Sequence, residues 1–336
     1  MTDLRGSRSL TGKLGKLKRK LLEFREEFFD PALRDPGRRR AIEFLRKNRV
    51  EAVLAEPGPS GCMIRTVCKA AEIPLYVHFH GRDAIVRGQS RRWQWHYKTL
   101  FRDASGVIVP SNYLRHAILG LGCPAQKIHV SPNGVDPAPF KAADHEVGRL
   151  LAVSRLVDVK GPLFTINAFK EVLKRHPESM LDFVGDGPLM EDCKALAKRL
   201  GIEDRIVFHG ALEHSKTLSL FKLASVFVQH SVKDFDGAEE SFGITFVEAA
   251  FSGIPVVATR SGGIPEVVVD KETGLLVEQG DHVAMAAAIS SLLDSPTEAK
   301  AMGERGRSRA LARFTMTESS ARLRRLMGVA EPVRHV

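Results

Sequence analysis

Short apolar runs alternate with amphipathic helical stretches along most of this 336-residue chain. Apolar runs of three to five residues between helices are typical of strands in a parallel sheet with helices on both faces. The spacing of these runs predicts two Rossmann-like, doubly wound α/β domains. The predicted strands are 52–55, 75–79, 106–109, 149–153, 181–184, 206–208, 226–228 and 255–258, and the predicted helices include 162–175, 189–200 and 282–293.

The segment 132–140 is rich in proline and contains an Asn-Gly pair, which predicts the connection between the two domains. We therefore expect a first domain over 50–140 and a second over 141–314. Residues 1–49 are expected to form a separate basic, helical segment.

Composition restricts the class of protein. The apolar fraction is 43%, as in globular domains, and no apolar run approaches the roughly 20 residues of a membrane span. The first residues lack the features of a secretory signal. The four cysteines have no metal-ligand spacing, which favours a reducing, cytoplasmic compartment. They are Cys62, Cys68, Cys123 and Cys193.

Positive charge is concentrated at the start of the chain, where residues 1–49 hold 15 of the 50 lysines and arginines. A basic amphipathic helix in this segment can lie on the inner face of an anionic membrane, or it can pack on the first domain with its lysines in water. The chain shows no nucleic-acid-binding signature, so no nucleic-acid partner is expected. The apolar positions of the helix are Leu10, Leu14, Leu17, Leu21, Phe24 and Phe28.

Residues 240–248 place two glutamates eight positions apart, with Gly243 between them. The following run to Phe251 predicts a helix, so Glu240 lies in the preceding loop and Glu248 within the helix. The first amides of a helix attract phosphate, and a glycine there lets the phosphate approach. Carboxylates accept hydrogen bonds from vicinal hydroxyls. The pattern therefore predicts half of a nucleotide-sugar site.

This segment and several others resemble the retaining GT-B glycosyltransferases whose signature is Glu, seven residues, Glu, known as glycosyltransferase family 4 or glycosyl transferases group 1. The resemblance extends over Ser154-Arg155-Leu156, Lys160-Gly161, Val184-Gly185-Asp186-Gly187-Pro188, Phe208-His209-Gly210, Gly253-Ile254-Pro255, Gly262-Gly263-Ile264-Pro265-Glu266 and Gly274-Leu275-Leu276-Val277. It continues in the first half through 78–83, 109–111 and 132–136. It implies a GT-B fold with two domains facing a cleft, and a helix at 315–330 that returns to the first domain.

The resemblance implies that Arg155 and Lys160 bind the donor diphosphate, and their place after a strand of a parallel sheet agrees with that role. Glu240 would hold the donor sugar and Glu248 the ribose, while helix amides reach the phosphate. Lys160 could instead be a surface lysine and Glu248 an exposed helix residue. The full donor-binding set is Arg155, Lys160, Phe242, Gly243, Ile244, Thr245 and Glu248, with Glu240 also assigned to catalysis.

Loops directly after two predicted strands are assigned to the neighbourhood of the nucleobase, although such glycines are often only turns. The residues are Gly185, Gly187, Gly210, Ala211 and Leu212.

Tyr76, His78 and His80 share one face of a predicted strand. By resemblance, His80 faces the reacting sugar and is assigned to catalysis. The His-x-His pair could ligate a metal, but the sequence shows no third ligand with convincing spacing, and His78 could be a packed structural histidine. Neither a metal nor a cofactor is expected.

Asp234-Phe235-Asp236 matches the Asp-x-Asp motif that holds a divalent cation in another class of glycosyltransferases. Its position in a polar loop favours solvated acids instead.

The resemblance implies a metal-independent hexosyltransferase that moves a sugar from a nucleotide diphosphate to a hydroxyl of a glycan or lipid-linked acceptor, with retention, in polysaccharide or glycolipid biosynthesis. Rival functions are a sugar phosphorylase or epimerase of the same fold, or a non-catalytic protein that binds nucleotide and a partner. The family's opening strand and glycine-rich loop are not seen before residue 52, so an incomplete N-terminal domain is expected, either because the start of the chain has been lost or because this domain is shortened.

Overall fold

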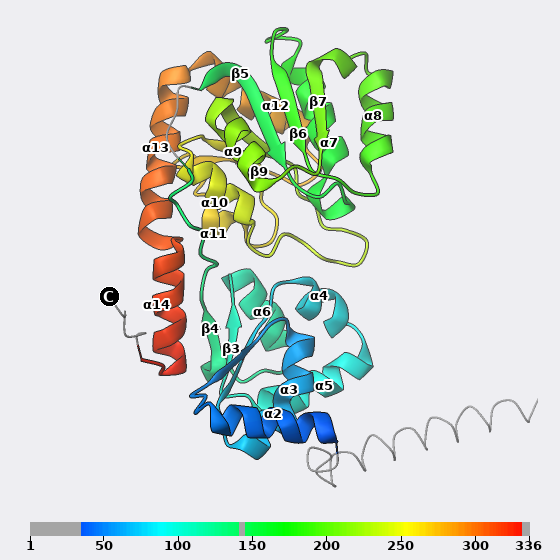
Figure 1. The fold of residues 1–336 in the computed structure, drawn as a ribbon. Coiled ribbons are helices and arrows are strands. Elements are labelled where there is room, and N and C mark those ends of the chain that lie inside the picture. Colours follow the sequence, from blue (N-terminus) through cyan, green and yellow to red (C-terminus); the bar gives the residue numbers. More distant parts are fainter. Residues whose placement is uncertain (1–34, 141–144, 331–336) are drawn as a thin grey trace, which may run out of the picture.

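The computed structural model describes residues 35–140 and 145–330, which form two α/β domains, each around one parallel sheet (Figure 1). The amphipathic helix expected from Leu10 to Phe28 lies outside the described residues. Among the helices of the described part, none combines the length and apolar character needed to cross a bilayer.

The first sheet has four parallel strands in the order of the chain, β1-β2-β3-β4. Its core is formed by fully buried side chains such as Val77, Phe79, Tyr97 and Val107. The strands are β1 (Val53–Ala55), β2 (Leu75–His78), β3 (Gly106–Val109) and β4 (Ile128–Val130), and the helices are α2 (Pro36–Lys47), α3 (Gly58–Ala71), α4 (Arg82–Gly88), α5 (Arg91–Asp103) and α6 (Asn112–Gly120), with a 3-10 turn η2 (Ala125–Lys127).

The second sheet has six parallel strands in the order β10-β9-β8-β5-β6-β7, so the direction of winding reverses between β5 and β8. The strands are β5 (Glu146–Val153), β6 (Met180–Val184), β7 (Ile206–Gly210), β8 (Ala224–Gln229), β9 (Val256–Thr259) and β10 (Gly274–Val277). The helices are α7 (Pro162–Val172), α8 (Met190–Arg199), α9 (His214–Leu223), α10 (Ile244–Phe251), α11 (Ile264–Val267), α12 (His282–Asp294), α13 (Pro296–Arg313) and α14 (Met316–Met327), with 3-10 turns η3 (Asp158–Lys160) and η4 (Glu203–Arg205).

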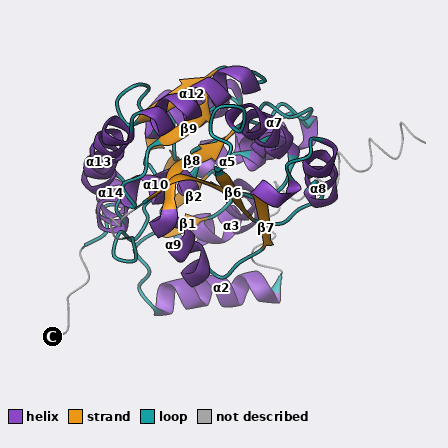
Figure 2. Cartoon of the chain, turned by 90° about the horizontal axis from the view of Figure 1, so that it is seen from above, coloured by secondary structure: helices purple, strands orange, loops and turns teal. Residues whose placement is uncertain are grey.

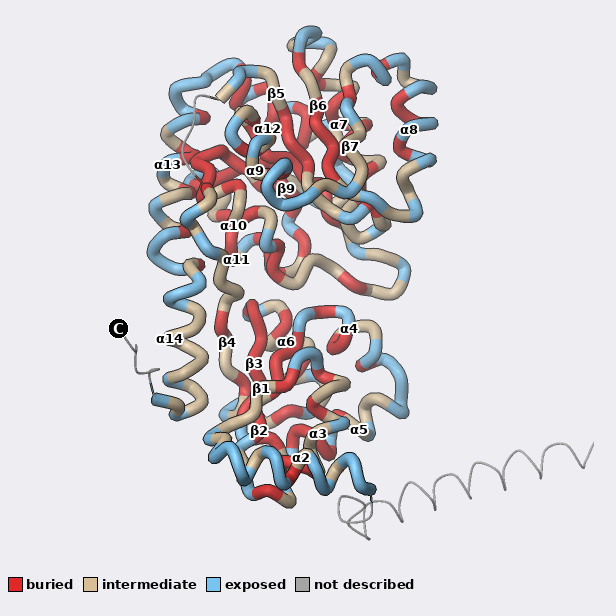
Figure 3. Tube along the Cα trace, viewed as in Figure 1, coloured by how far each residue is buried: buried red, intermediate tan, exposed pale blue. Residues whose placement is uncertain are grey.

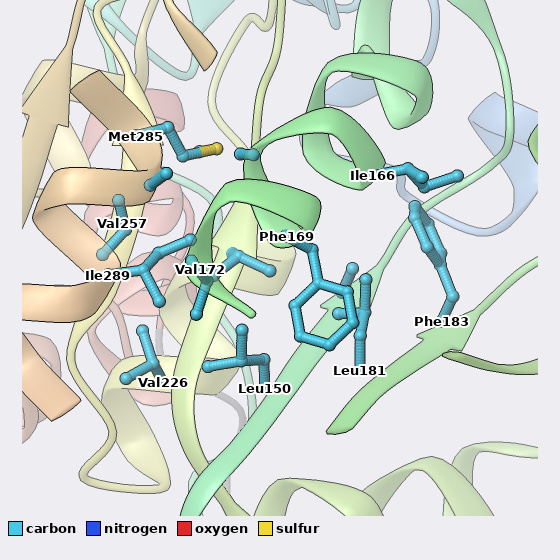
Figure 4. Close-up of a cluster of buried hydrophobic side chains, with 14 of the residues drawn as sticks. Leu150, Ile166, Phe169, Val172, Leu181, Phe183, Val226, Val257, Met285 and Ile289 are labelled. Atoms are coloured by element: carbon cyan, nitrogen blue, oxygen red, sulfur yellow. The ribbon is translucent and has the colours of Figure 1, made fainter. Parts of the chain in front are cut away.

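Helices cover both faces of the second sheet (Figure 2). Side chains alternate along β5, so Leu150 packs into a core beneath α7 and α12, whereas Leu151 packs into a core beneath α9 and α10. Figure 4 shows Leu150 beside Phe169 of α7 and Val226 of β8. Buried residues follow the strands, and exposed residues follow the outer helices (Figure 3). Each fully buried aliphatic or aromatic side chain contributes about 2 kcal/mol from removal of apolar surface from water.

All eight predicted strands are present, with bounds that differ by a few residues, and the doubly wound second domain is confirmed. Two strands were missed. β4 has only three residues with a histidine in the middle, whereas β10 has an apolar run as long as that of β3, which was predicted.

The last helix, α14, lies beside the first domain, near β4 (Figure 1). The amide of Val135 donates to Phe314 O, and the amide of Met316 donates to Val135 O, both at 2.9 Å. Ser319 Oγ donates to Pro132 O at 3.1 Å. The segment 132–135 is therefore attached to the start of α14. We propose that the domain boundaries lie at 140/141 and 314/315.

Candidate active site

The reversal of strand order in the second sheet brings together the loops that follow β5 and β8. Such a switch point is where open α/β sheets bind ligands. Lys160 of η3 and Glu240 of the loop after β8 form an ion pair there. Gln229 Nε2 lies 3.3 Å from Glu240 Oε2. The structure thus places two of the predicted donor-binding residues in direct contact, and it adds Gln229, which the sequence analysis did not identify.

Gly161 fixes the approach of the Lys160 turn to the end of β8. Its φ is +54°, and a Cβ at this position would lie 1.9 Å from His230 O. Only glycine allows this contact without displacing the backbone. His230 itself is buried and stacks on Phe164, and burial lowers its pKa to about 4.

Gly243 caps α10 with a φ of +83°, and a Cβ there would lie 2.3 Å from the ring of Phe246. The next residues, Ile244 and Thr245, form the first turn of the helix, whose amides lack partners within the helix. Phe242 is buried and packs edge-on against Phe314, with ring centroids 5.7 Å apart. Its side chain therefore supports the loop from below.

Two glycines hold the backbone of the Glu240 loop. A Cβ at Gly262 would lie 2.0 Å from Glu240 O, and a Cβ at Gly263 would lie 2.2 Å from Ser241 O. The amide of Gly263 also donates to Glu240 O at 2.7 Å. Glycines at 262 and 263 therefore let the chain pass close to the backbone of Glu240 and Ser241, the loop that carries the Glu240 carboxylate.

Glu248 lies within α10 and is partly buried among apolar neighbours. Burial raises the pKa of its carboxyl from near 4.5 to about 7. Within the described residues no side chain or amide donates a hydrogen bond to this carboxylate, so it is poised for an external donor. The alternative of an ordinary, fully exposed helix residue does not fit this burial.

Arg155 is exposed in the loop after β5, and in the described part of the chain its guanidinium has no ion-pair partner. The loop after β6 packs against the loop after β5 through backbone contacts. A Cβ at Gly185 would lie 1.9 Å from Ser154 O, and a Cβ at Gly187 would lie 2.5 Å from Leu156 O. These two glycines are therefore explained by loop packing, whether or not a base lies beside them.

The second loop of the predicted base neighbourhood follows β7. The amide of Gly185 donates to Gly210 O at 2.8 Å, which joins this loop to the loop after β6. Gly210 has a φ of +64° with open space around its missing Cβ, and Ala211 is exposed while Leu212 is partly buried. The five predicted residues thus lie on two adjacent loops.

On the first domain, His78 and His80 converge on Glu56, which directly follows β1. His78 Nδ1 lies 2.8 Å from Glu56 Oε1, His80 Nε2 lies 3.7 Å from Glu56 Oε2, and the imidazole centroids are 4.4 Å apart. Burial lowers the pKa of His78. One ligand atom from each group falls within 4.8 Å of the others, so Glu56 is a possible third ligand, which the sequence analysis did not identify. The available signal was a carboxylate at the end of a predicted strand.

His80 touches the second domain through its backbone. Ser241 Oγ donates to His80 O, and Ser111 Oγ donates to Ser241 O at 2.6 Å. A Cβ at Gly81 would lie 2.9 Å from Ser241 Oγ. The predicted catalytic residues His80 and Glu240 thus lie on loops that touch: His80 accepts the hydrogen bond from Ser241, and Glu240 is the residue before Ser241.

Asp234 and Asp236 both form ion pairs with one arginine of the first domain. Arg82 Nη1 lies 2.9 Å from Asp234 Oδ2, and Nη2 lies 2.9 Å from Asp236 Oδ2. Asp234 also accepts from the amide of Ala238. These contacts make the Asp-x-Asp segment a bridge between domains, and neither the cation motif nor simple solvation describes it.

Two parallel-sheet domains that face each other at the carboxyl ends of their strands, with an ion pair and a helix N-terminus at the switch point of the second sheet, define the class of two-domain α/β proteins with the GT-B fold. The family described as glycosyl transferases group 1 matches residues 139–309, and glycosyltransferase family 4 matches residues 18–139. This chain belongs to the glycosyl transferases group 1 family.

Curated relatives agree with this assignment. A GDP-mannose-dependent alpha-(1-6)-phosphatidylinositol monomannoside mannosyltransferase of Mycolicibacterium smegmatis is 33% identical over 238 residues, covering 67% of this chain and 62% of the relative. The putative colanic acid biosynthesis glycosyltransferase WcaL of Escherichia coli is 28% identical over 260 residues, covering 74% of this chain and 63% of the relative. The chain thus spans less than two thirds of the length of these relatives.

The fold is also that of solved structures. Anabaena HepE in complex with UDP superposes with a TM-score of 0.75 at 21% identity, over 86% of this chain and 81% of that one.

Proposed function

We propose that this protein is a retaining glycosyltransferase that moves a hexose from a nucleoside diphosphate to a hydroxyl of a glycan or glycolipid. The Lys160–Glu240 pair beside the Gly243-capped N-terminus of α10 carries this proposal. The site offers a cation and helix amides for a diphosphate and a carboxylate for sugar hydroxyls. The relatives named for mannosyl transfer and for colanic acid biosynthesis support the same class of reaction.

In this proposal Arg155, Lys160 and the first amides of α10 stabilise the negative charge that develops on the leaving diphosphate. The bond between the anomeric carbon and the phosphate oxygen breaks, and a bond to the acceptor oxygen forms on the same face of the sugar. The proton of the acceptor hydroxyl passes to the departing phosphate oxygen. Glu240 orients the sugar hydroxyls, and His80 lies on the opposite domain to stabilise the transition state.

We further propose that the donor site works without a divalent metal. Lys160 and Arg155 supply positive charge, and Arg82 already neutralises the two aspartates that could have held a cation nearby. Glu248 would take the ribose hydroxyls, and the loops at 185–187 and 210–212 the base. We also propose that the basic residues among 1–49 attract the protein to an anionic cytoplasmic membrane surface, where a lipid-linked acceptor would be located.

The test is the change in melting temperature on addition of UDP, GDP or ADP, first with EDTA and then with magnesium. A nucleotide at 100 times its Kd stabilises by about 2.7 kcal/mol. We expect one nucleotide to raise the melting temperature equally in both buffers. Transfer is then measured with the sugar nucleotides of that base and octyl glycosides as acceptors.

The variant for this test is Arg155→Ala with Lys160→Ala, and its matched control is Lys216→Ala with Lys222→Ala on the exposed face of α9. Both double variants remove two positive charges. Removal of Lys160 leaves Glu240 without its cation, so each protein is compared with its own unliganded melting temperature. Loss of the nucleotide shift only in the first variant supports the site. The absence of any shift in the wild-type protein would contradict the proposal.

Two rival activities are separated by product analysis. A phosphorylase requires inorganic phosphate and an epimerase requires no acceptor, whereas the proposed enzyme releases nucleoside diphosphate in proportion to the glycoside formed. A non-catalytic binding protein would show the thermal shift without release.

A further inference from the structure

Glu56 has the geometry of a binding group that the donor site does not use. It lies one residue beyond the carboxyl end of β1, and its side chain is 46% exposed. One carboxylate oxygen is 2.8 Å from His78 Nδ1, and the other is 3.7 Å from His80 Nε2, beyond hydrogen-bonding distance. Each oxygen offers about two acceptor positions, so the carboxylate retains free acceptor capacity.

The loops that carry Glu56 and His80 are tied together by Asp83. This buried carboxylate accepts hydrogen bonds from the amides of Gly58, His80 and Gly81, at 3.0, 3.0 and 2.9 Å. Gly58 lies so close to the ring of Phe79 that a Cβ would meet it at 2.2 Å. The backbone two residues after Glu56 is therefore tied to the loop of His80.

His78 completes the arrangement from below. Its side chain is buried and its Nδ1 lies 2.8 Å from Glu56 Oε1, so the ring can donate a hydrogen bond to that carboxylate. His80 O is bonded to Ser241 Oγ, and Ser241 is adjacent to Glu240. Glu56 is therefore linked through His80 to the loop that carries Glu240.

We propose that Glu56 is an acceptor-binding residue, whose carboxylate accepts a hydrogen bond from a hydroxyl of the incoming glycoside, while His78 holds the carboxylate in place. This inference rests on the proposed glycosyltransferase function. An acceptor-only group beside His80 on the first domain suits a hydroxyl donor, and two of its roughly four acceptor positions can engage adjacent hydroxyls of one sugar.

The experiment compares Glu56→Gln with the wild-type protein and with the control Glu43→Gln, an exposed glutamate of α2. Titration calorimetry measures the Kd of octyl α-mannoside and octyl α-glucoside in the presence of the saturating nucleoside diphosphate. We expect Glu56→Gln to bind the preferred glycoside at least 10-fold more weakly and the nucleotide within 2-fold of wild type. Glu43→Gln should match wild type for both ligands.

A second readout separates contact with the acceptor from support of His80. Where the donor is also hydrolysed by water, Glu56→Gln should lower transfer to the glycoside at least 10-fold more than hydrolysis. Equal losses in the two reactions would make Glu56 a structural support and overturn the proposal. It would equally be overturned by unchanged glycoside affinity, or by a wild-type protein that binds nucleotide but neither glycoside.

Metal binding by Glu56, His78 and His80 is a result that would contradict the proposal. Zinc binding by the wild-type protein that disappears in Glu56→Gln, with activity lost in EDTA, would assign Glu56, His78 and His80 to an ion and overturn acceptor binding. Failure of the donor itself appears separately, because a wild-type protein that shows no nucleotide shift contradicts the proposed function before any acceptor is added.

Discussion

Glu248 is the residue whose ionisation most directly connects burial with stability. Its pKa is raised to about 7, so the native protein keeps a proton that the unfolded chain releases above about pH 4.5. The free energy of unfolding therefore falls as pH rises from 4.5 to 7, by about 3 kcal/mol from this group. Glu248→Gln should lack this term, melting higher than wild type at pH 8 and equally at pH 4.5. The exposed control Glu304→Gln should follow wild type, and identical pH profiles for all three proteins would refute the prediction.

Gly243 should tolerate no side chain. Gly243→Ala forces a Cβ to within 2.3 Å of the Phe246 ring at a φ of +83°, so we expect a loss of about 3 kcal/mol and weaker nucleotide binding. Gly280→Ala is the matched control, because its φ is +84° but nothing lies within 4 Å of the new atom. Urea denaturation should show the smaller loss, about 1 kcal/mol, for the control. Equal losses would show that backbone strain alone determines the effect.

The sequence predicted single residues best where the spacing along the chain is itself the signal, as for Glu240 and Glu248. It could not predict the partners of Glu56 or Glu240. The meeting of Glu56 with His78 depends on the register of β1 and β2, in which Ala55 pairs with Val77, and one sequence does not fix that register. The assignments to ligand binding stay predictions until they are measured.

The attachment of α14 should depend on the segment 132–135, which is hydrogen-bonded to the start of this helix. A Cβ at Gly134 would lie 2.7 Å from Met316 Cα, which is backbone and cannot rotate away. Gly134→Ala should therefore cost about 1–3 kcal/mol and expose α14 to limited proteolysis. Gly120→Ala at the end of α6 has open space and should be close to neutral. Resistance of α14 in the first variant equal to that in the second would contradict the prediction.

Most strands were predictable because short apolar runs alternated with helices at a regular interval. The strands β4 and β10 were missed: β4 has only three residues with a central histidine, whereas β10 carries an apolar run as long as that of β3, and the pairing of both is seen only in the assembled sheet. The reversal of strand order between β5 and β8, which creates the site, is likewise a property of the assembled sheet.

For the whole molecule, Arg82 should affect the relative position of the domains more than stability. Its side chain is 53% exposed, so its pairs with Asp234 and Asp236 contribute less than about 1 kcal/mol. Arg82→Ala should melt within a few degrees of wild type but show a larger radius of gyration in small-angle scattering. Arg205→Ala, which removes a pair with Glu178 inside the second domain, should leave the radius unchanged. A radius unaffected by loss of Arg82 would show that the other contacts suffice.

Ser241 lies in the loop between Glu240 and Gly243, and its hydroxyl and carbonyl are bonded to His80 and Ser111 of the other domain. A ligand that binds this loop and orders it would therefore also favour the arrangement of the two domains in which these hydrogen bonds form. Thermodynamic linkage makes such an effect reciprocal: the factor by which a bound donor improves the affinity for the acceptor equals the factor by which a bound acceptor improves the affinity for the donor. Ser241 thus couples the loop beside the proposed donor site to the loop of His80 on the other domain.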